Sequence, residues 1–294
     1  MTAVFYVVLL GAILGLLCGR IQEGLRRLLH GRPWIVWLVP PLLTGVFALA
    51  ALSAGETNPA LFAMVLAYTT VPVACAAVQG PGHIDRPTLL DFATVLLFWL
   101  PLEFPAGAAR LVAKHSQGFL HSVAYGIAIL LGLVLFVGVR SFPGMKYNLP
   151  RSFRDVGNAL AGFALTAPVL IVIGIGIGFI PPAHLPTAGA GRMASAGFII
   201  FVATGLPEEI LFRSMIQNLL GLRFGQGART LLVASVIFGA AHLDNGPQAL
   251  PNWRYMILAT IAGWAYGKVF ERSSTVLAST LFHALVDWTK HFFF

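Results

Sequence analysis

Long apolar runs with few charged residues constrain the fold of this chain more than any other feature. Only 10% of its 294 residues are charged, whereas about a quarter are charged in a typical soluble domain. Apolar runs of about 18 residues or more are typical of membrane helices. We therefore predict a protein that crosses the bilayer several times. The runs cover residues 3–18, 34–54, 60–79, 88–109, 118–139, 154–180, 193–220, 229–243, 255–270 and 274–293.

The fold class follows from the hydrogen-bonding needs of the backbone in lipid. Only helices and closed barrels satisfy those needs, and the alternating strands of a barrel are not visible in this sequence. We predict an all-α, multi-pass bundle of about eight to ten membrane segments, with its polar site inside the membrane. Pro101, Glu103 and Pro105 interrupt the fourth run, and Gly205 and Pro207 favour a division of the seventh into two helices.

A basic, turn-rich connection at residues 140–154 divides the chain in two. We predict accessory transmembrane helices in residues 1–150 and the chemical core in residues 151–294. The net charge of +8 is explained by basic loops on the cytoplasmic side, and no aromatic-basic module for nucleic acid is visible. The expected partner is thus the lipid bilayer and not nucleic acid. The same rule places the loop of residues 20–32 in the cytoplasm, and Arg110 and Lys114 on the opposite side.

Two adjacent carboxylates and an arginine lie inside the seventh run, in the segment PEEILFR. Charged groups are rare inside a membrane and mark functional sites or structural pairs. Pro207 is tolerated in a first helical turn, so we expect a helix to begin there. Glu209 and Arg213 have the spacing and order of an ion pair on one helix face. Glu208 is rotated by about 100° from Glu209, where a poorly hydrated carboxylate would suit a general base acting on water.

Two histidines occur in later apolar runs, each within a short motif. His242 follows Phe238 by four residues near a helix end, where a lone histidine is more often a capping residue than a catalyst. His283 and Asp287 are also four residues apart and so share one helix face. Such a pair can orient a carbonyl, stabilise an oxyanion or bind a metal. Taken alone, the pair of His283 and Asp287 is better explained by a local hydrogen bond between helices.

Considered together, Glu208, His242 and His283 come from three different apolar runs. One polar cluster accounts for them better than three separate burials of a polar group. The HExxH motif of many zinc peptidases is absent. These three residues could still bind Zn²⁺ as a Lewis acid, and they would equally form a metal-free site for water. We favour the metal-free alternative.

The motifs EExxxR, FxxxH and HxxxN/D, in this order, resemble those of the CPBP family, which comprises the type II CAAX prenyl proteases and bacteriocin-processing relatives. The matching residues are Glu208, Glu209, Arg213, Phe238, His242, His283 and Asp287. The resemblance implies a family domain over about residues 153–290. It also implies that Glu209, Arg213 and Phe238 support the site.

The same resemblance implies roles for the remaining motif residues. Glu208 and His242 would activate the attacking water, while His283 and Asp287 would hold the scissile carbonyl and its oxyanion. The eukaryotic prenyl proteases have Asn at the position of Asp287. An ionised carboxylate at this position accepts hydrogen bonds or binds metal, but it cannot donate to an oxyanion.

The leading hypothesis is an intramembrane endopeptidase that hydrolyses a peptide bond of a membrane-anchored or hydrophobic substrate, in a bacterial plasma membrane. An ion-coupled transporter is an alternative, with Asp91, Glu103, Glu208 and Glu209 as a proton path. It predicts an inverted repeat, and no second Glu-Glu motif is present. A non-catalytic membrane scaffold is a third possibility. Asp91 and Glu103 lie at interrupted or terminal parts of a helix, so we expect them at the membrane interface.

Overall fold

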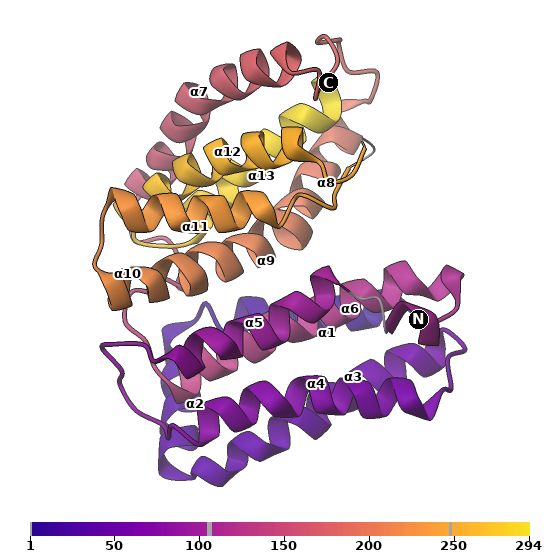
Figure 1. Cartoon of the computed structure of the whole chain (residues 1–294), viewed down its shortest axis with the longest axis vertical. Coiled ribbons are helices and arrows are strands. Elements are labelled where there is room, and N and C mark those ends of the chain that lie inside the picture. Colours follow the sequence, from indigo (N-terminus) through magenta and orange to yellow (C-terminus); the bar gives the residue numbers. More distant parts are fainter. Residues whose placement is uncertain (1, 105–107, 247–248) are drawn as a thin grey trace. The chain divides into compact units, whose positions relative to one another are not determined.

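The computed structural model describes residues 2–104, 108–246 and 249–294. Every regular element in these ranges is helical, as the all-α prediction requires. The chain divides into two compact units, Met1–Gly144 and Met145–Phe294. This division falls within the basic connection at residues 140–154. Figure 1 follows the first unit from indigo to magenta and the second from pink to yellow.

The N-terminal unit is a bundle in which α3 packs against α4 and α6, α4 against α5, and α1 against α6. Its elements are α1 (Thr2–Gly15), α2 (Gly19–Gly31), η1 (Pro33–Leu38), α3 (Val39–Ser53), α4 (Pro59–Ala77), α5 (Leu89–Glu103), η2 (Ala108–Leu111), α6 (Lys114–Leu133) and η3 (Val134–Val139). The basic segment that we interpreted as a loop after the first run forms helix α2. This helix turns by 88° from the direction of α1.

A buried ion pair ties the end of η3 to the start of α5 in this unit. Arg140 donates from Nε to Asp91 Oδ1 at 2.9 Å and from Nη2 to Asp91 Oδ2 at 3.1 Å. Asp91 also closes a capping box with Thr88 at the first turn of α5. Asp91 lies at a helix end, as predicted, but its carboxylate is almost fully buried in protein. Glu103, at the other end of α5, accepts a hydrogen bond from Trp99 Nε1 at 2.8 Å.

The C-terminal unit is built around α11, α12 and α13, which follow one another in the chain. Helix α11 packs along α12, and α7 contacts both α12 and α13 (Figure 1). Its elements are α7 (Phe153–Gly176), α8 (Ala190–Ile200), η4 (Phe201–Gly205), α9 (Leu206–Glu209), η5 (Ile210–Gln217), α10 (Asn218–Phe224), α11 (Ala228–Ala240), α12 (Trp253–Arg272) and α13 (Leu277–Phe293).

The expected division of the seventh run at Gly205 and Pro207 is wrong. One helical segment continues from Ala190 to Phe224, and Pro207 lies inside it. The segment is π-helical over Phe201–Gly205 and again over Ile210–Gln217. A π-helical turn shifts the backbone hydrogen bonds by one residue, which lets a proline without an N–H occupy an interior position. The two glutamates therefore lie on a short α-helical turn between two widened segments.

Glycines allow α11 and α12 to approach closely beside the polar residues. A Cβ atom on Gly239 would overlap Thr260 Oγ1 and lie 2.7 Å from the carbonyl oxygen of Met256. A Cβ atom on Gly263 would lie 2.9 Å from Cδ1 of Phe238. This contact positions the end of α11, where Phe238 and His242 lie, against α12.

Five helical segments in the described ranges are long and apolar enough to cross a membrane, or six if α1 and α2 count as one bent span. They are Pro33–Ser53, Pro59–Ala77, Lys114–Val139, Phe153–Gly176 and Ala190–Phe224. The sequence predicted about eight to ten segments. The difference arises partly because α5, α11 and α13 have 15, 13 and 17 residues, which is short for a span. The long apolar segments support an integral membrane protein.

Candidate active site

The two adjacent glutamates of α9 have different surroundings. Glu209 and Arg213 are completely buried, and Arg213 Nε lies 3.2 Å from Glu209 Oε2. The predicted ion pair between them is therefore present. The side chain of Glu208 is 22% exposed. The backbone rotation between neighbouring helical residues thus gives one inward-facing acid and one acid with partial access to the outside.

Arg213 connects this ion pair to Gln217 and to the ring of Phe238. Its Nη1 donates to Gln217 Oε1 at 3.4 Å, and its guanidinium carbon lies 4.9 Å from the centre of the Phe238 ring. Within the described part of the chain, Nη2 has no hydrogen-bond partner. The arginine therefore counters the charge of Glu209 while part of its donor capacity remains unused.

His283 is the residue around which the carboxylates gather. Its Nδ1 donates to Glu209 Oε1 at 3.1 Å, and its Nε2 lies 3.4 Å from Asp287 Oδ2 and 3.9 Å from Glu208 Oε2. The imidazole is almost fully buried. Tyr266 stacks on it with ring centres 4.6 Å apart and an interplanar angle of 18°. The i,i+4 spacing thus places Asp287 beside His283, and α9 supplies the other two acids.

His242 follows the last turn of α11 and is held by its own helix. Its Nδ1 lies 2.8 Å from the carbonyl oxygen of Phe238. A carbonyl oxygen only accepts, so Nδ1 carries the hydrogen and Nε2 of the neutral ring is left as an acceptor. The ring packs against Tyr255, with centres 4.5 Å apart. The FxxxH spacing therefore fixes both the position and the tautomer of this histidine.

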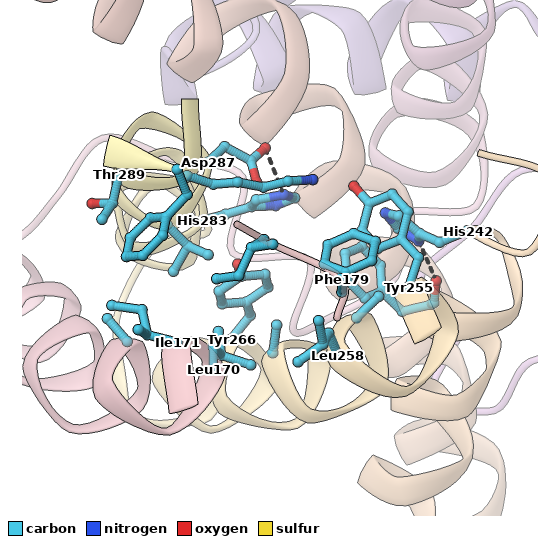
Figure 2. A pocket seen from close by; sticks show the side chains of 18 residues that line it. Leu170, Ile171, Phe179, His242, Tyr255, Leu258, Tyr266, His283, Asp287 and Thr289 are labelled. Carbon is cyan, nitrogen blue, oxygen red and sulfur yellow. Dashed lines mark hydrogen bonds and ion pairs between the residues drawn. The ribbon is translucent and has the colours of Figure 1, made fainter. Parts of the chain in front are cut away.

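A cavity of about 80 Å³ brings His242, His283 and Asp287 together. Figure 2 shows His283 beside Asp287 in one part of the wall and His242 beside Tyr255 in another. Glu208 is not among the 18 residues that line the cavity. Its Oε2 atom lies 3.9 Å from Nε2 of His283, which does line it. The structure thus collects His283 with three acids, and it places His242 across the same cavity.

The predicted metal ligands do not form a shared coordination site. Among the described residues, no group of three or more His, Cys, Asp or Glu side chains is placed to hold a metal ion. His242 has its Nδ1 engaged by Phe238, and Glu208 lies outside the cavity wall. Within the described residues, Glu208, His242 and His283 are therefore not placed to bind one metal ion together, and this donor set does not fit a metal held by all three.

Several cavity residues were not predicted from the sequence. Tyr255 and Tyr266 come from α12, in which no motif pointed to the site. Lys290 also lines the cavity, and its Nζ lies 4.6 Å from the centre of the Phe179 ring and 4.7 Å from that of Tyr255. A signal for Lys290 did exist, because it follows Asp287 by three residues and shares its helix face.

Residues 191–289 match the family profile described as Type II CAAX prenyl endopeptidase Rce1-like. This segment of the chain is Rce1-like. It covers about one third of the chain and contains all seven residues of the predicted motifs. The resemblance to CAAX proteases is thereby confirmed over these residues, which run from α8 into α13. Neither the curated proteins nor the solved structures give a significant match.

The Rce1-like match supports a CAAX-protease-like intramembrane endopeptidase, and hence a peptidase held in a membrane. The N-terminal unit and helix α7 lie outside the matched residues. The site described above lies within the Rce1-like segment, apart from cavity residues contributed by α7, residues 179–180 and the C-terminal end of the chain.

Proposed function

We propose that this protein hydrolyses a peptide bond of a membrane-associated or hydrophobic substrate, using water activated by Glu208 and His242. The observation that carries the proposal is the gathering of three carboxylates around His283, next to a cavity that also exposes His242. A polar cluster of this kind among apolar helices is costly to bury, and such clusters inside membranes commonly serve a function.

Glu208 is suited to the role of general base. Its side chain is 22% exposed, whereas Glu209 is fully buried and paired with Arg213, so Glu208 is the acid that an entering water would meet first. Water would lose a proton to Glu208 as its oxygen attacks the carbonyl carbon. Glu208 would then pass this proton to the departing amine nitrogen as the C–N bond breaks. The Nε2 atom of His242 would accept a hydrogen bond from the same water and orient it.

His283 and Asp287 are suited to the carbonyl side of the reaction. The Nε2–H of a protonated His283 would be shared between Asp287 Oδ2 and the carbonyl oxygen as negative charge develops on that oxygen. An ionised Asp287 cannot donate in this way, so its proposed role is to orient His283 through the 3.4 Å contact. Glu209 holds the opposite ring nitrogen and fixes the plane of the imidazole.

The acids of the N-terminal unit offer less support for a proton path. Asp91 is held in a two-contact ion pair with Arg140, and Glu103 accepts from Trp99. Each has a structural partner within its own unit. The transporter hypothesis is therefore weaker than the peptidase hypothesis, and the scaffold hypothesis becomes one outcome of the test below.

The test compares peptide termini in membranes that contain the wild-type protein or Glu208→Gln at matched levels. Glu271→Gln is the control, because its carboxylate is 28% exposed, close to the 22% of Glu208, and pairs with Lys268 away from the cluster. We expect termini that appear with wild type and with Glu271→Gln but not with Glu208→Gln. If folded wild-type protein yields no terminus that depends on Glu208, the peptidase proposal fails and a scaffold is favoured.

A further inference from the structure

Helix α2 has the geometry of a helix that lies along a membrane surface. It joins α1 to the candidate span Pro33–Ser53 and turns by 88° from α1. If α1 enters the bilayer along its normal beside the span Pro33–Ser53, the 88° turn lays α2 nearly parallel to the membrane plane. Amphipathic helices with basic polar faces occupy this position at membrane interfaces.

One side of α2 is fastened to the end of η3. Arg26 Nε donates to the carbonyl oxygen of Val137 at 3.0 Å. His30 Nε2 lies 3.1 Å from the carbonyl oxygens of both Gly138 and Val139. These carbonyls belong to the π-helical end of α6, whose backbone hydrogen bonds are shifted, so α2 supplies donors to them. The contacts fix which side of α2 faces outward.

The outward side combines an apolar edge with a charged edge. Ile21 and Leu28 form the apolar edge, and both are exposed. Arg20 and Arg27 lie beside them on the helix surface, and the side chain of Arg27 is 77% exposed. Glu23 is the one acid in α2, and it pairs with Arg27. An apolar strip next to arginines matches the boundary between acyl chains and headgroups.

Two tryptophans extend this surface beyond the end of α2. Trp34 and Trp37 in η1 are both exposed, and tryptophan is enriched at the headgroup level of membranes. They share with Leu29 and Val139 the wall of a cavity of about 120 Å³. The side chains that line the cavity are apolar, which suits hydrocarbon.

We propose that α2, together with Trp34 and Trp37, is a binding surface for anionic phospholipid. Arg20 and Arg27 would hold the anionic headgroup, because basic side chains at the membrane surface attract lipids of net negative charge. The tryptophans and their cavity would hold the first part of an acyl chain. The basic loop that contains α2 is predicted to face the cytoplasm, where the leaflet carries negative charge. A nucleic acid would leave the apolar edge without a partner.

The test measures lipid selectivity of the full chain. The protein is equilibrated in micelles that contain equal amounts of phosphatidylglycerol and phosphatidylcholine with identical acyl chains, and the bound lipids are counted by native mass spectrometry. We expect the wild type to retain phosphatidylglycerol preferentially. In R20Q/R27Q the preference should fall by about fivefold for each arginine that contacts a headgroup. R20K/R27K, which keeps the charges, should retain most of the preference.

The matched control is R110Q/K114Q, which removes two exposed basic residues from the same unit at the side predicted to be opposite. It should leave the preference unchanged. W34A/W37A should reduce the amount of both lipids without changing their ratio. The proposal is overturned if the wild type shows no preference, if R20Q/R27Q keeps it while remaining folded, or if R110Q/K114Q loses it equally. If R20Q/R27Q unfolds, R20K/R27K with an unchanged fold and no preference would also overturn it.

Discussion

Each unit of this protein contains a buried acid–arginine pair, and the two pairs are completed differently. In the N-terminal unit, Asp91 and Arg140 meet through two contacts of 2.9 and 3.1 Å, and Arg140 also donates to Gln79 and Gly80. In the C-terminal unit, Glu209 meets Arg213 through Nε at 3.2 Å. The other oxygen of Glu209 accepts from His283.

We call the group formed by Asp91, Arg140, Gln79 and Gly80 the closed network. We call the group formed by Glu209, Arg213 and His283 the open network. The guanidinium of Arg140 is engaged at Nε, Nη1 and Nη2, whereas Nη2 of Arg213 has no hydrogen-bond partner in the described residues. The closed network joins backbone segments and stabilises them. The open network passes through His283 to Asp287 and the cavity, where a substrate could complete it. Burial of charge alone therefore does not identify a site, and incomplete pairing beside a cavity is the more useful signal.

The largest effect is expected for Glu209→Ala, because this acid serves both stability and the site. Removing one partner of a buried ion pair leaves Arg213 uncompensated and should lower the free energy of unfolding by about 3–5 kcal/mol. His283 would also lose the acceptor at Nδ1, so cleavage per folded molecule should fall by about 100-fold. Thermal unfolding and active-fraction-normalised cleavage measure the two effects separately. Full activity in the folded fraction would contradict a positioning role for Glu209.

Asp91→Ala should reproduce only the first of these effects. The substitution leaves Arg140 buried without its carboxylate partner, so it should also lower the free energy of unfolding by about 3–5 kcal/mol. Cleavage per folded molecule should remain within about twofold of wild type, since Asp91 belongs to the closed network. The same two measurements apply. A large loss of activity in correctly folded Asp91→Ala would bring the proton-path hypothesis back into consideration.

Local spacing explains which parts of the site could be predicted from the sequence. Glu209 and Arg213, like His283 and Asp287, are four residues apart, so helix geometry alone places each pair on one face. The apolar runs likewise predicted the helical fold. The partner of Asp91 could not be predicted in this way, because Arg140 is 49 residues distant in the chain.

Other features depend on tertiary packing or on unusual backbone geometry. Tyr266 reaches His283 only because α12 packs beside α13. The π-helical segments around Pro207 have no clear sequence signal, so a break was expected where the helix continues. Helix α2 is rich in arginine and was interpreted as a loop, although its amphipathic pattern provided a signal for an interfacial helix.

A smaller effect is expected from Gly239→Ala, which tests whether close helix packing holds the open network in place. The new Cβ atom would meet Thr260 and the backbone of Met256, so the stability loss should be about 1–3 kcal/mol. The control is Gly157→Ala in α7, where nothing lies within 4 Å of a new Cβ atom and helix propensity should improve stability by up to about 1 kcal/mol. Equal unfolding midpoints for the two variants would contradict the tight α11–α12 contact.

The smallest effect is expected for Asp287→Asn. The amide oxygen still accepts from His283 Nε2, and the amide nitrogen adds a donor that a carboxylate lacks. The value of kcat/KM on one peptide substrate should therefore change by less than about tenfold, whereas Asp287→Ala, which removes the acceptor, should cost more. A loss in Asp287→Asn as large as in Asp287→Ala would show that the negative charge itself is required.

In the open network His283 keeps Glu208 and Glu209 as further acids, and for this reason one neutralised acid is tolerable there. The closed network offers Arg140 no second carboxylate within the described ion pairs, so Asp91→Asn should be the more damaging of the two Asn substitutions to stability.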